Sequence, residues 1–154
     1  MALKFTTGTR TAVAGTRGLK DLFNGGVIDI YSGGQPAAPD NAETGVLLVR
    51  ISVNSATAGI TGYSGTAGIT FGTAGAGSIP KSADVWSGVV GVAGVAGYFR
   101  LYGTASTSGS SSTTCRMDGN VGVSGSDLVL ANTSLTANAT LTVDQFTLTV
   151  PVSA

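Results

Sequence analysis

Along most of the chain, short apolar and β-branched runs alternate with stretches of glycine, serine, proline and other turn-forming residues. Residues 27–31 form the first run and end at Ser32-Gly33-Gly34, and residues 46–53 form a second run in which only Arg50 is charged. Runs of about four to eight residues rich in valine, isoleucine and aromatic side chains, bounded by turn residues, are typical of strands. We therefore expect a strand over each run, with the proline-containing residues 35–42 as a surface loop.

The second half of the chain continues this pattern. Residues 85–99 form a long apolar run with several glycines, and we expect a buried strand that extends over residues 89–102. Residues 139–150 alternate between two sets of side chains, which is the period of a half-buried antiparallel strand. Asp118-Gly119 lies between two short segments of strand-forming residues and predicts a two-residue hairpin turn.

Two stretches are low in complexity. The sequence TAGIT occurs twice between residues 57 and 70, and we expect two short strands, around Ile60 and over residues 69–71. Calcium-binding β-rolls also repeat at this period, but they need an aspartate in each repeat, and residues 54–83 contain neither aspartate nor glutamate. Residues 104–114 are polar throughout and predict a loop with nothing to bury. Together the runs give about eight strands at spacings of roughly 8–12 residues, the pattern of an all-β sandwich or barrel.

The first 24 residues differ from the rest of the chain. Half of the eight basic residues occur here, before any acidic residue: Lys4, Arg10, Arg17 and Lys20. Residues 16–23 predict one or two helical turns that end at Asn24-Gly25-Gly26 through a left-handed residue. The basic excess has two interpretations: a solvated flexible arm, or an extended arm that docks on a negatively charged neighbouring subunit. The predicted domains are an N-terminal arm, residues 1–24, and a β-sandwich domain, residues 25–154.

The composition indicates a protein that is part of an assembly. Charged residues make up 10% of the chain, against about 25% in an average soluble domain. The exterior must therefore consist largely of threonine, serine, glycine and alanine, although secreted β-domains rich in threonine and serine share this composition. A formal net charge of +0 argues against nucleic-acid binding, which needs a basic surface. The N-terminus has no apolar run typical of a secretion signal, and residues 85–99 are too short for a membrane helix.

The sequence offers little for catalysis. It has no histidine and a single cysteine, Cys115, which excludes histidine-based triads, an intramolecular disulfide framework and cysteine-rich zinc sites. The aspartates are scattered singly over predicted strands and turns, and no glycine-rich phosphate loop is present. We therefore expect a protein that is not an enzyme and that uses no cofactor or metal ion, with Cys115 as a half-buried structural thiol.

Three stretches together resemble small virion proteins of tailed bacteriophages. They are LFNGGVIDIYSGGQPA at residues 22–37, ETGVLL at residues 43–48, and DGNVG, SGSDLVL and FTLTVP between residues 118 and 151. The resemblance covers most of residues 19–151 and consists of turns and strands, not of active-site residues. It is closest in kind to capsid decoration, or cement, proteins. It implies an antiparallel, jelly-roll-like β-sandwich that is present as trimers on the outside of an icosahedral head. The extended N-terminal arm that we infer from the basic residues precedes this sandwich.

The function implied by this resemblance is mechanical. The protein would stabilise the shell by binding the major capsid protein and further copies of itself in a homotrimer, with neither nucleic acid nor a membrane as partner. It would be made in the cytoplasm of the bacterial host and reside on the capsid surface. The residues expected to contact the shell lie in the arm: Lys4, Phe5, Arg10 and Arg17. The alternatives are a carbohydrate-binding or adhesin-like module of a phage fibre or tail tip, and a tail-tube or connector protein.

Overall fold

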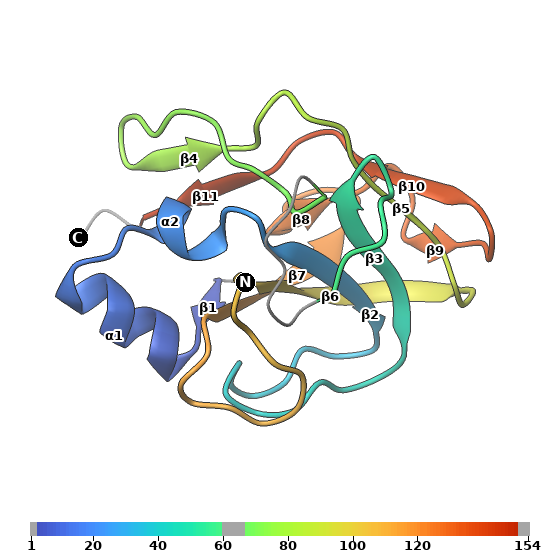
Figure 1. Ribbon diagram of the computed structural model, residues 1–154. Coiled ribbons are helices and arrows are strands. Elements are labelled where there is room, and N and C mark those ends of the chain that lie inside the picture. The colour runs from blue at the N-terminus through green and yellow to red at the C-terminus, as the bar shows by residue number, and fades with distance from the viewer. Residues whose placement is uncertain (1–2, 60–66, 151–154) are drawn as a thin grey trace.

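The computed structural model describes residues 3–59 and 67–150, and strands predominate in it (Figure 1). Its two helices are α1 (Thr7–Gly15) and α2 (Leu19–Phe23). The strands of the described residues are β1 (Lys4–Phe5), β2 (Val27–Ser32), β3 (Leu47–Val53), β4 (Ser78–Pro80), β5 (Trp86–Val89), β6 (Gly94–Tyr102), β7 (Arg116–Gly122), β8 (Leu128–Val129), β9 (Ser134–Leu135), β10 (Thr140–Val143) and β11 (Thr147–Thr149). The prediction of an all-β protein is confirmed.

One main sheet organises the molecule. Its strands follow the order β1-β7-β6-β2-β3-β5-β10, and each neighbouring pair in this path is antiparallel. Strand β9 pairs with the start of β6, and β8 runs parallel to the end of β7. Strands β4 and β11 form a separate antiparallel pair. The central position of β2, between β3 and β6, places its residues 27–32 in the middle of the fold.

The two faces of the main sheet have different chemistry. Successive residues of a strand point to opposite faces, so Ile28 and Ile30 of β2 point one way and Asp29 and Tyr31 the other. The isoleucine face is the hydrophobic core, which α2, β4, β11 and residues 128–135 cover with apolar side chains. Trp86 lies in this core, and its ring centroid is 5.2 Å from that of Phe71 and 5.8 Å from that of Phe146. The opposite face is polar and is covered by loops.

The two longest predicted strands are each divided in the structure. The run over residues 85–99 forms β5 and β6, which occupy different places in the sheet, and no helix among the described residues is long and apolar enough to cross a membrane. Residues 139–150 form β10 in the main sheet and β11 in the small one. The buried side chains here are Val143, Phe146 and Leu148. The step of three between Val143 and Phe146 breaks the period of two, because the chain passes from one sheet to the other.

The predicted hairpin turn at Asp118-Gly119 is wrong. Both residues lie in the middle of β7, where Asp118 is opposite Arg100 and Gly119 is opposite Phe99. The Asp118 carboxylate is ion-paired with Arg100, and a Cβ atom on Gly119 would lie 2.6 Å from the ring of Phe99. The aspartate and the glycine are therefore needed for pairing and close packing within a strand, not for a turn.

The repeat region gives less regular structure than predicted. Ile60 lies outside the described residues. Ile69 and Phe71 form isolated bridges with Gly26 and Lys81 rather than a strand. Both side chains nevertheless belong to the hydrophobic core, so this segment contributes burial without regular pairing.

The prediction of an extended N-terminal arm is also wrong. Residues 4–23 fold onto the sheet as β1, α1 and α2, and β1 pairs with the edge of β7. Thr6 and Thr9 are buried, and the Thr6 hydroxyl accepts a hydrogen bond from the Thr9 backbone N–H, which caps α1. The helical turns predicted over residues 16–23 are confirmed as α2, and Gly25 is left-handed with φ of +79°. The described part of residues 1–24 is thus continuous with the β-domain.

Candidate functional site

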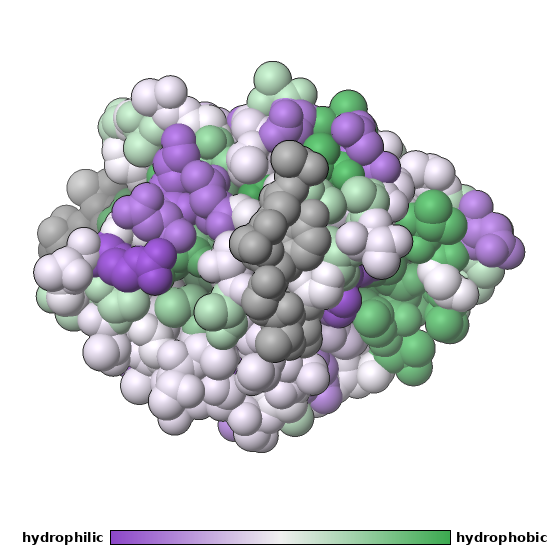
Figure 2. All heavy atoms as spheres, viewed as in Figure 1, coloured by the Kyte–Doolittle hydropathy of each residue, from purple (hydrophilic) through white to green (hydrophobic). Residues whose placement is uncertain are grey.

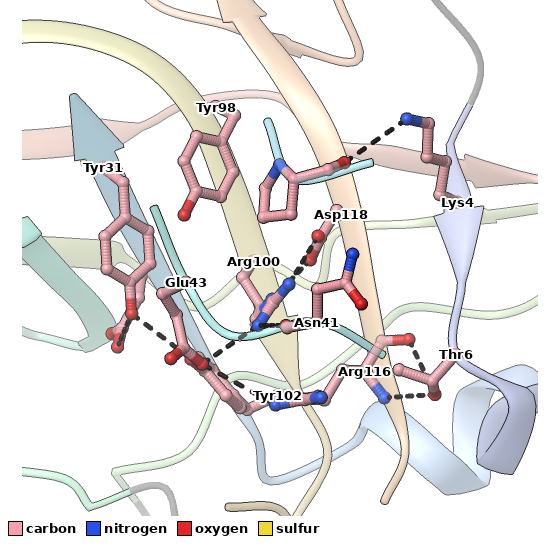
Figure 3. A network of polar contacts seen from close by, with 12 residues as sticks. Lys4, Thr6, Tyr31, Asn41, Glu43, Tyr98, Arg100, Tyr102, Arg116 and Asp118 are labelled. Carbon is pink, nitrogen blue, oxygen red and sulfur yellow. Dashed lines mark hydrogen bonds and ion pairs between the residues drawn. The ribbon is translucent and has the colours of Figure 1, made fainter. Parts of the chain in front are cut away.

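A layer of charged side chains lies on the polar face of the main sheet. Strands β2, β3, β6 and β7 are adjacent, and each contributes to this layer: Asp29 from β2, Arg50 from β3, Arg100 from β6, and Arg116 and Asp118 from β7. Glu43 joins them from the loop between β2 and β3. Figure 3 shows Glu43, Arg100, Arg116 and Asp118 meeting between the strands and this loop. We call these six residues the ionic layer.

Strand register creates the two strongest pairs of the ionic layer. Arg100 lies opposite Asp118 and donates to both of its carboxylate oxygens, at 2.6 and 2.7 Å. Arg50 lies opposite Asp29 and donates to both oxygens of that carboxylate at 2.6 Å. Such two-pronged pairs are short and strong because the planar guanidinium matches the carboxylate geometry. Removal from water raises the pKa of Asp118 and of Asp29, although their arginines act in the opposite direction.

Glu43 connects the ionic layer to the loops that cover it. One carboxylate oxygen accepts from the Arg100 guanidinium at 3.0 Å and from the Tyr102 hydroxyl at 2.6 Å, and the other accepts from the Gly109 N–H at 2.9 Å. Burial by itself would raise the pKa of Glu43. The hydrogen bonds from Tyr102 and Gly109, with the charge of Arg100, outweigh burial and lower that pKa. Glu43 is therefore ionised and holds two loops against the sheet.

Arg116 anchors the polar loop of residues 104–114. Its guanidinium donates to the carbonyl oxygens of Thr107 and Gly109 at 3.1 and 2.5 Å and to that of Ser111 at 2.9 Å. A further bond reaches the carbonyl of Asp40 at 3.3 Å. This loop, which the sequence predicts to bury nothing, instead supplies backbone acceptors for a fully buried cation. Burial, with the nearby charge of Arg100, lowers the pKa of Arg116.

The ionic layer joins neighbouring strands to each other and to the loops that cover them. Its carboxylates are occupied by arginines, and no group of three residues that could hold a metal ion exists in the described part of the chain. The sequence did not reveal this layer, because its members are single charges in separate runs that only the strand register brings together. It engages six of the sixteen charged residues, four of them buried and two, Glu43 and Arg50, partly buried. The other ten are distributed over a chain of 154 residues.

The four shell-contact residues predicted from the sequence are only partly brought together. Phe5 and Arg10 line the same groove, whereas Lys4 and Arg17 are outside its lining. The Lys4 ammonium is 3.2 Å from the carbonyl oxygen of Ala37, so it binds the loop beside β1. Arg10 and Arg17 are exposed, and Phe5 is half-buried against the core.

The groove between the N-terminal helices and the small sheet is an apolar hollow with a volume of about 500 Å³. Its lining comes from α1, α2, β1, β4 and the end of β11: Phe5, Thr9, Arg10, Val13, Ala14, Gly18, Leu19, Ile79 and Val150. We call this the N-terminal groove. Ile79 and Val150 join it from segments far away in the sequence, and no local pattern could have assigned them to it.

Arg10 lines the N-terminal groove, and Arg17 and Lys20 are next to its lining residues Gly18 and Leu19 in the sequence. Arg10 donates to the Thr7 hydroxyl at 3.0 Å, and Arg17 donates to the carbonyl oxygen of Asp21 at 3.2 Å. Lys20 donates to the carbonyl oxygen of Gly72 at 2.7 Å. Neither these three nor Lys4 forms an ion pair within residues 3–59 and 67–150. Against the effect of burial, hydrogen bonds from Thr7 and the charge of Arg10 together lower the pKa of Asp40. This side of the molecule therefore combines an apolar hollow with basic side chains that form no direct ion pair.

Almost all aromatic side chains of the described residues are buried. Nine of the ten aromatic residues are in the described ranges, and eight of these nine are buried. Tyr31 and Tyr98 stack at 5.1 Å, but beneath the loops of the polar face. The remaining one, Phe5, is half-buried. The described surface thus offers no exposed aromatic pair of the kind that stacks on a sugar ring.

Comparison of the chain with protein-family models, with curated proteins and with solved structures found no match.

Proposed function

We propose that this chain is a non-enzymatic structural virion protein of a tailed bacteriophage. In this proposal it binds the outside of an icosahedral head and stabilises the shell of the major capsid protein as a homotrimer. It is made in the host cytoplasm and acts on the capsid surface, and its strands follow a jelly-roll-like sandwich plan. The observation that carries the proposal is the N-terminal groove, an apolar hollow with Arg10 in its lining and with Arg17 and Lys20 next to its lining residues in the sequence.

The distribution of charge supports an assembled state. A solitary small domain normally keeps about 25–35% charged residues on its surface, which maintains solubility. This chain has sixteen charged residues and places six of them in the ionic layer. The surface that remains is rich in small polar and apolar groups, which cost little to desolvate against a partner.

The N-terminal groove defines the chemistry of the shell partner. An apolar side chain of the major capsid protein enters between Phe5, Val13 and Leu19, and acidic residues beside it face Arg10 and Arg17. The binding free energy of one such contact is modest. A trimer that engages several capsid subunits at once multiplies the effect, because the second and third contacts form at a high effective concentration.

The test measures attachment of purified protein to heads that lack it. Val13 lines the groove and is 44% exposed, so Val13→Asp places a charge in the hollow with little effect on the core. Val85→Asp is the matched control, because Val85 is 51% exposed and lies outside the groove. We expect Val13→Asp to weaken attachment at least about tenfold, the effect of roughly 1.4 kcal/mol, and Val85→Asp to attach like the wild type.

Salt dependence tests the electrostatic part of the same contact. Attachment of the wild type should weaken as salt is raised, because exposed charges are screened beyond about 8–10 Å near physiological ionic strength. The double variant Arg10→Gln/Arg17→Gln should attach more weakly and depend less on salt. Undiminished attachment of Val13→Asp would exclude the groove as the contact, and failure of the wild type to attach at all would overturn the decoration role.

A further inference from the structure

A second apolar surface lies at the opposite end of the molecule from the N-terminal groove. Five large aliphatic side chains are exposed there: Val46, Leu47, Val89, Val92 and Val95. We call them the valine surface. Figure 2 shows apolar residues gathered over the start of β6 and the start of β3, whereas α1 and α2 lie at the other end in Figure 1.

Backbone contacts bring the members of the valine surface together. The N–H groups of Gly91 and Val92 both donate to the carbonyl oxygen of Leu48, at 2.8 and 3.4 Å, which joins the turn after β5 to the start of β3. The carbonyl oxygen of Val46 accepts from Ser32, and Ser32 is opposite Ala96, next to Val95. Two segments that are far apart in the sequence therefore form one patch.

The segments that form the valine surface contain no charged residue. The segments that form it, residues 44–49 and 85–99, lack aspartate, glutamate, lysine and arginine. Strands β9 and β10 flank it, since Ser134 is opposite Val95 and Thr140 is opposite Val89. Residues 128–143, which include both flanking strands, are uncharged as well. The two exposed basic residues of the described chain, Arg10 and Arg17, lie in the N-terminal segment instead.

We propose that the valine surface is where copies of this chain bind one another. The inference assigns a surface to the self-association that belongs to the proposed function. Two copies can bring uncharged patches together without like-charge repulsion and without burying an unpaired ion, which makes the surface self-complementary. A nucleic acid or an anionic membrane would need cations here, and the surface has none.

The open edge of β10 favours the same occupant. Among the described strands β10 pairs only with β5, so its other edge is free along Thr140–Val143. Exposed edges of folded proteins are normally protected by charge, proline or a bulge, and this strand has neither charge nor proline. A neighbouring copy that covers Val89 also covers this adjoining edge.

A contact between copies needs a rim around the apolar valine surface. The largest apolar patch of a monomer is typically about 300–600 Å², and a stable protein interface needs roughly 800 Å² on each partner. The valine surface supplies the apolar centre, and the glycine, alanine, serine and threonine residues of the flanking strands supply the rim. Small rim side chains allow close approach of the two backbones.

The experiment compares valines at the two ends of one strand. Val89 is 53% exposed and belongs to the valine surface, whereas Val85, just before β5, is 51% exposed and lies about 13 Å away along the chain at roughly 3.3 Å per residue. We expect sedimentation analysis of the free protein to show an oligomer for the wild type and for Val85→Asp. Val89→Asp, and Val95→Asp at a residue that is 62% exposed, should sediment as monomers with self-association weakened at least tenfold. Fluorescence of buried Trp86 and thermal unfolding check that both variants remain folded.

The outcomes separate this inference from the proposed function because no heads are present. A wild-type protein that stays monomeric overturns the inference, and the surface then belongs to another partner. Folded Val89→Asp and Val95→Asp proteins that remain oligomeric overturn it as well. An oligomer that dissociates in both variants supports it, even if the wild type fails to attach to heads. A dimer in place of a trimer supports the surface but contradicts the proposed homotrimer.

Discussion

The pair of Arg100 and Asp118 provides the sharpest test of how the fold is held together. Both side chains are 0% exposed, and the pair joins the adjacent strands β6 and β7. Asp118→Asn preserves the shape of the side chain and removes its charge. Arg100 then remains buried as a cation, with Glu43 at 3.0 Å as its one acidic partner among the described residues.

The expected loss follows from the burial of the remaining charge. Removing one partner of a buried ion pair typically costs about 3–5 kcal/mol, because the other charge stays uncompensated in a medium of low dielectric constant. For a domain of this size each kcal/mol lowers Tm by about 2–4 °C. We therefore expect Tm to fall by roughly 6–20 °C.

Thermal unfolding followed by circular dichroism and by Trp86 fluorescence measures this effect. Asp144→Asn is the matched control, because Asp144 is exposed and a surface substitution of this kind usually changes stability by less than about 0.5 kcal/mol. The double variant Arg100→Met/Asp118→Leu should be more stable than Asp118→Asn, since it leaves no buried charge unpaired. A loss below about 1 kcal/mol in Asp118→Asn, or a double variant less stable than the single one, would refute the reasoning.

Three further predictions concern single residues. The folded-state pKa of Glu43 lies below its ordinary value of 4.5, so its stabilising contribution is complete above that pH and is lost as pH falls through the lower folded value. The difference in Tm between wild type and Glu43→Gln should accordingly be greatest near neutrality and shrink in acid, and a difference independent of pH would contradict this. Gly97→Ala should lose about 1–3 kcal/mol in urea unfolding, because its Cβ would lie 1.9 Å from the Gly33 carbonyl oxygen. Gly34→Ala is the control and should leave the free energy of unfolding unchanged, because there is open space around Gly34. Cys115→Ser should leave stability and assembly essentially unchanged, and loss of assembly with an intact fold would reveal a role for the thiol.

Sequence periodicity predicted the strands wherever one local rule decided the structure. The runs over residues 27–31 and 46–53 became β2 and β3 almost residue for residue, because their side chains and flanking turn residues specify a buried strand by themselves. The run over residues 139–150 obeys the same rule in each half. Its division at Asp144 and Gln145 depends on which sheet each half joins, which local pattern does not encode.

Features that depend on strand register or on contacts between distant segments could not be predicted from the sequence. Asp118-Gly119 has the residues of a turn, and only the position of Arg100 and Phe99 on the neighbouring strand makes it part of β7. Helix α1 has three threonines, two glycines and a valine among its nine residues, whereas a stable isolated helix needs better helix formers. Its formation depends on the Thr6 cap and on burial of Thr9 against β7, where the Thr9 hydroxyl donates to the Arg116 carbonyl oxygen at 3.1 Å.

The candidate site was predicted in its charge but not in its shape. The surplus of basic residues before Asp21 is visible in the sequence and led to Arg10 and Arg17. The apolar hollow is not, because Val13, Ile79 and Val150 come together only when α1, β4 and β11 are packed. An extended arm would have had the same composition, so composition alone could not distinguish an arm from a folded edge of the domain.

The most direct test of the proposed function is the number and position of copies of this chain on purified virus particles from the source that encodes it. Quantitative mass spectrometry gives the copy number relative to the major capsid protein, and electron microscopy of decorated and undecorated heads gives the position. The proposal predicts hundreds of copies on the outer surface of the head. A few copies confined to the tail, or no copies on any particle, would contradict it.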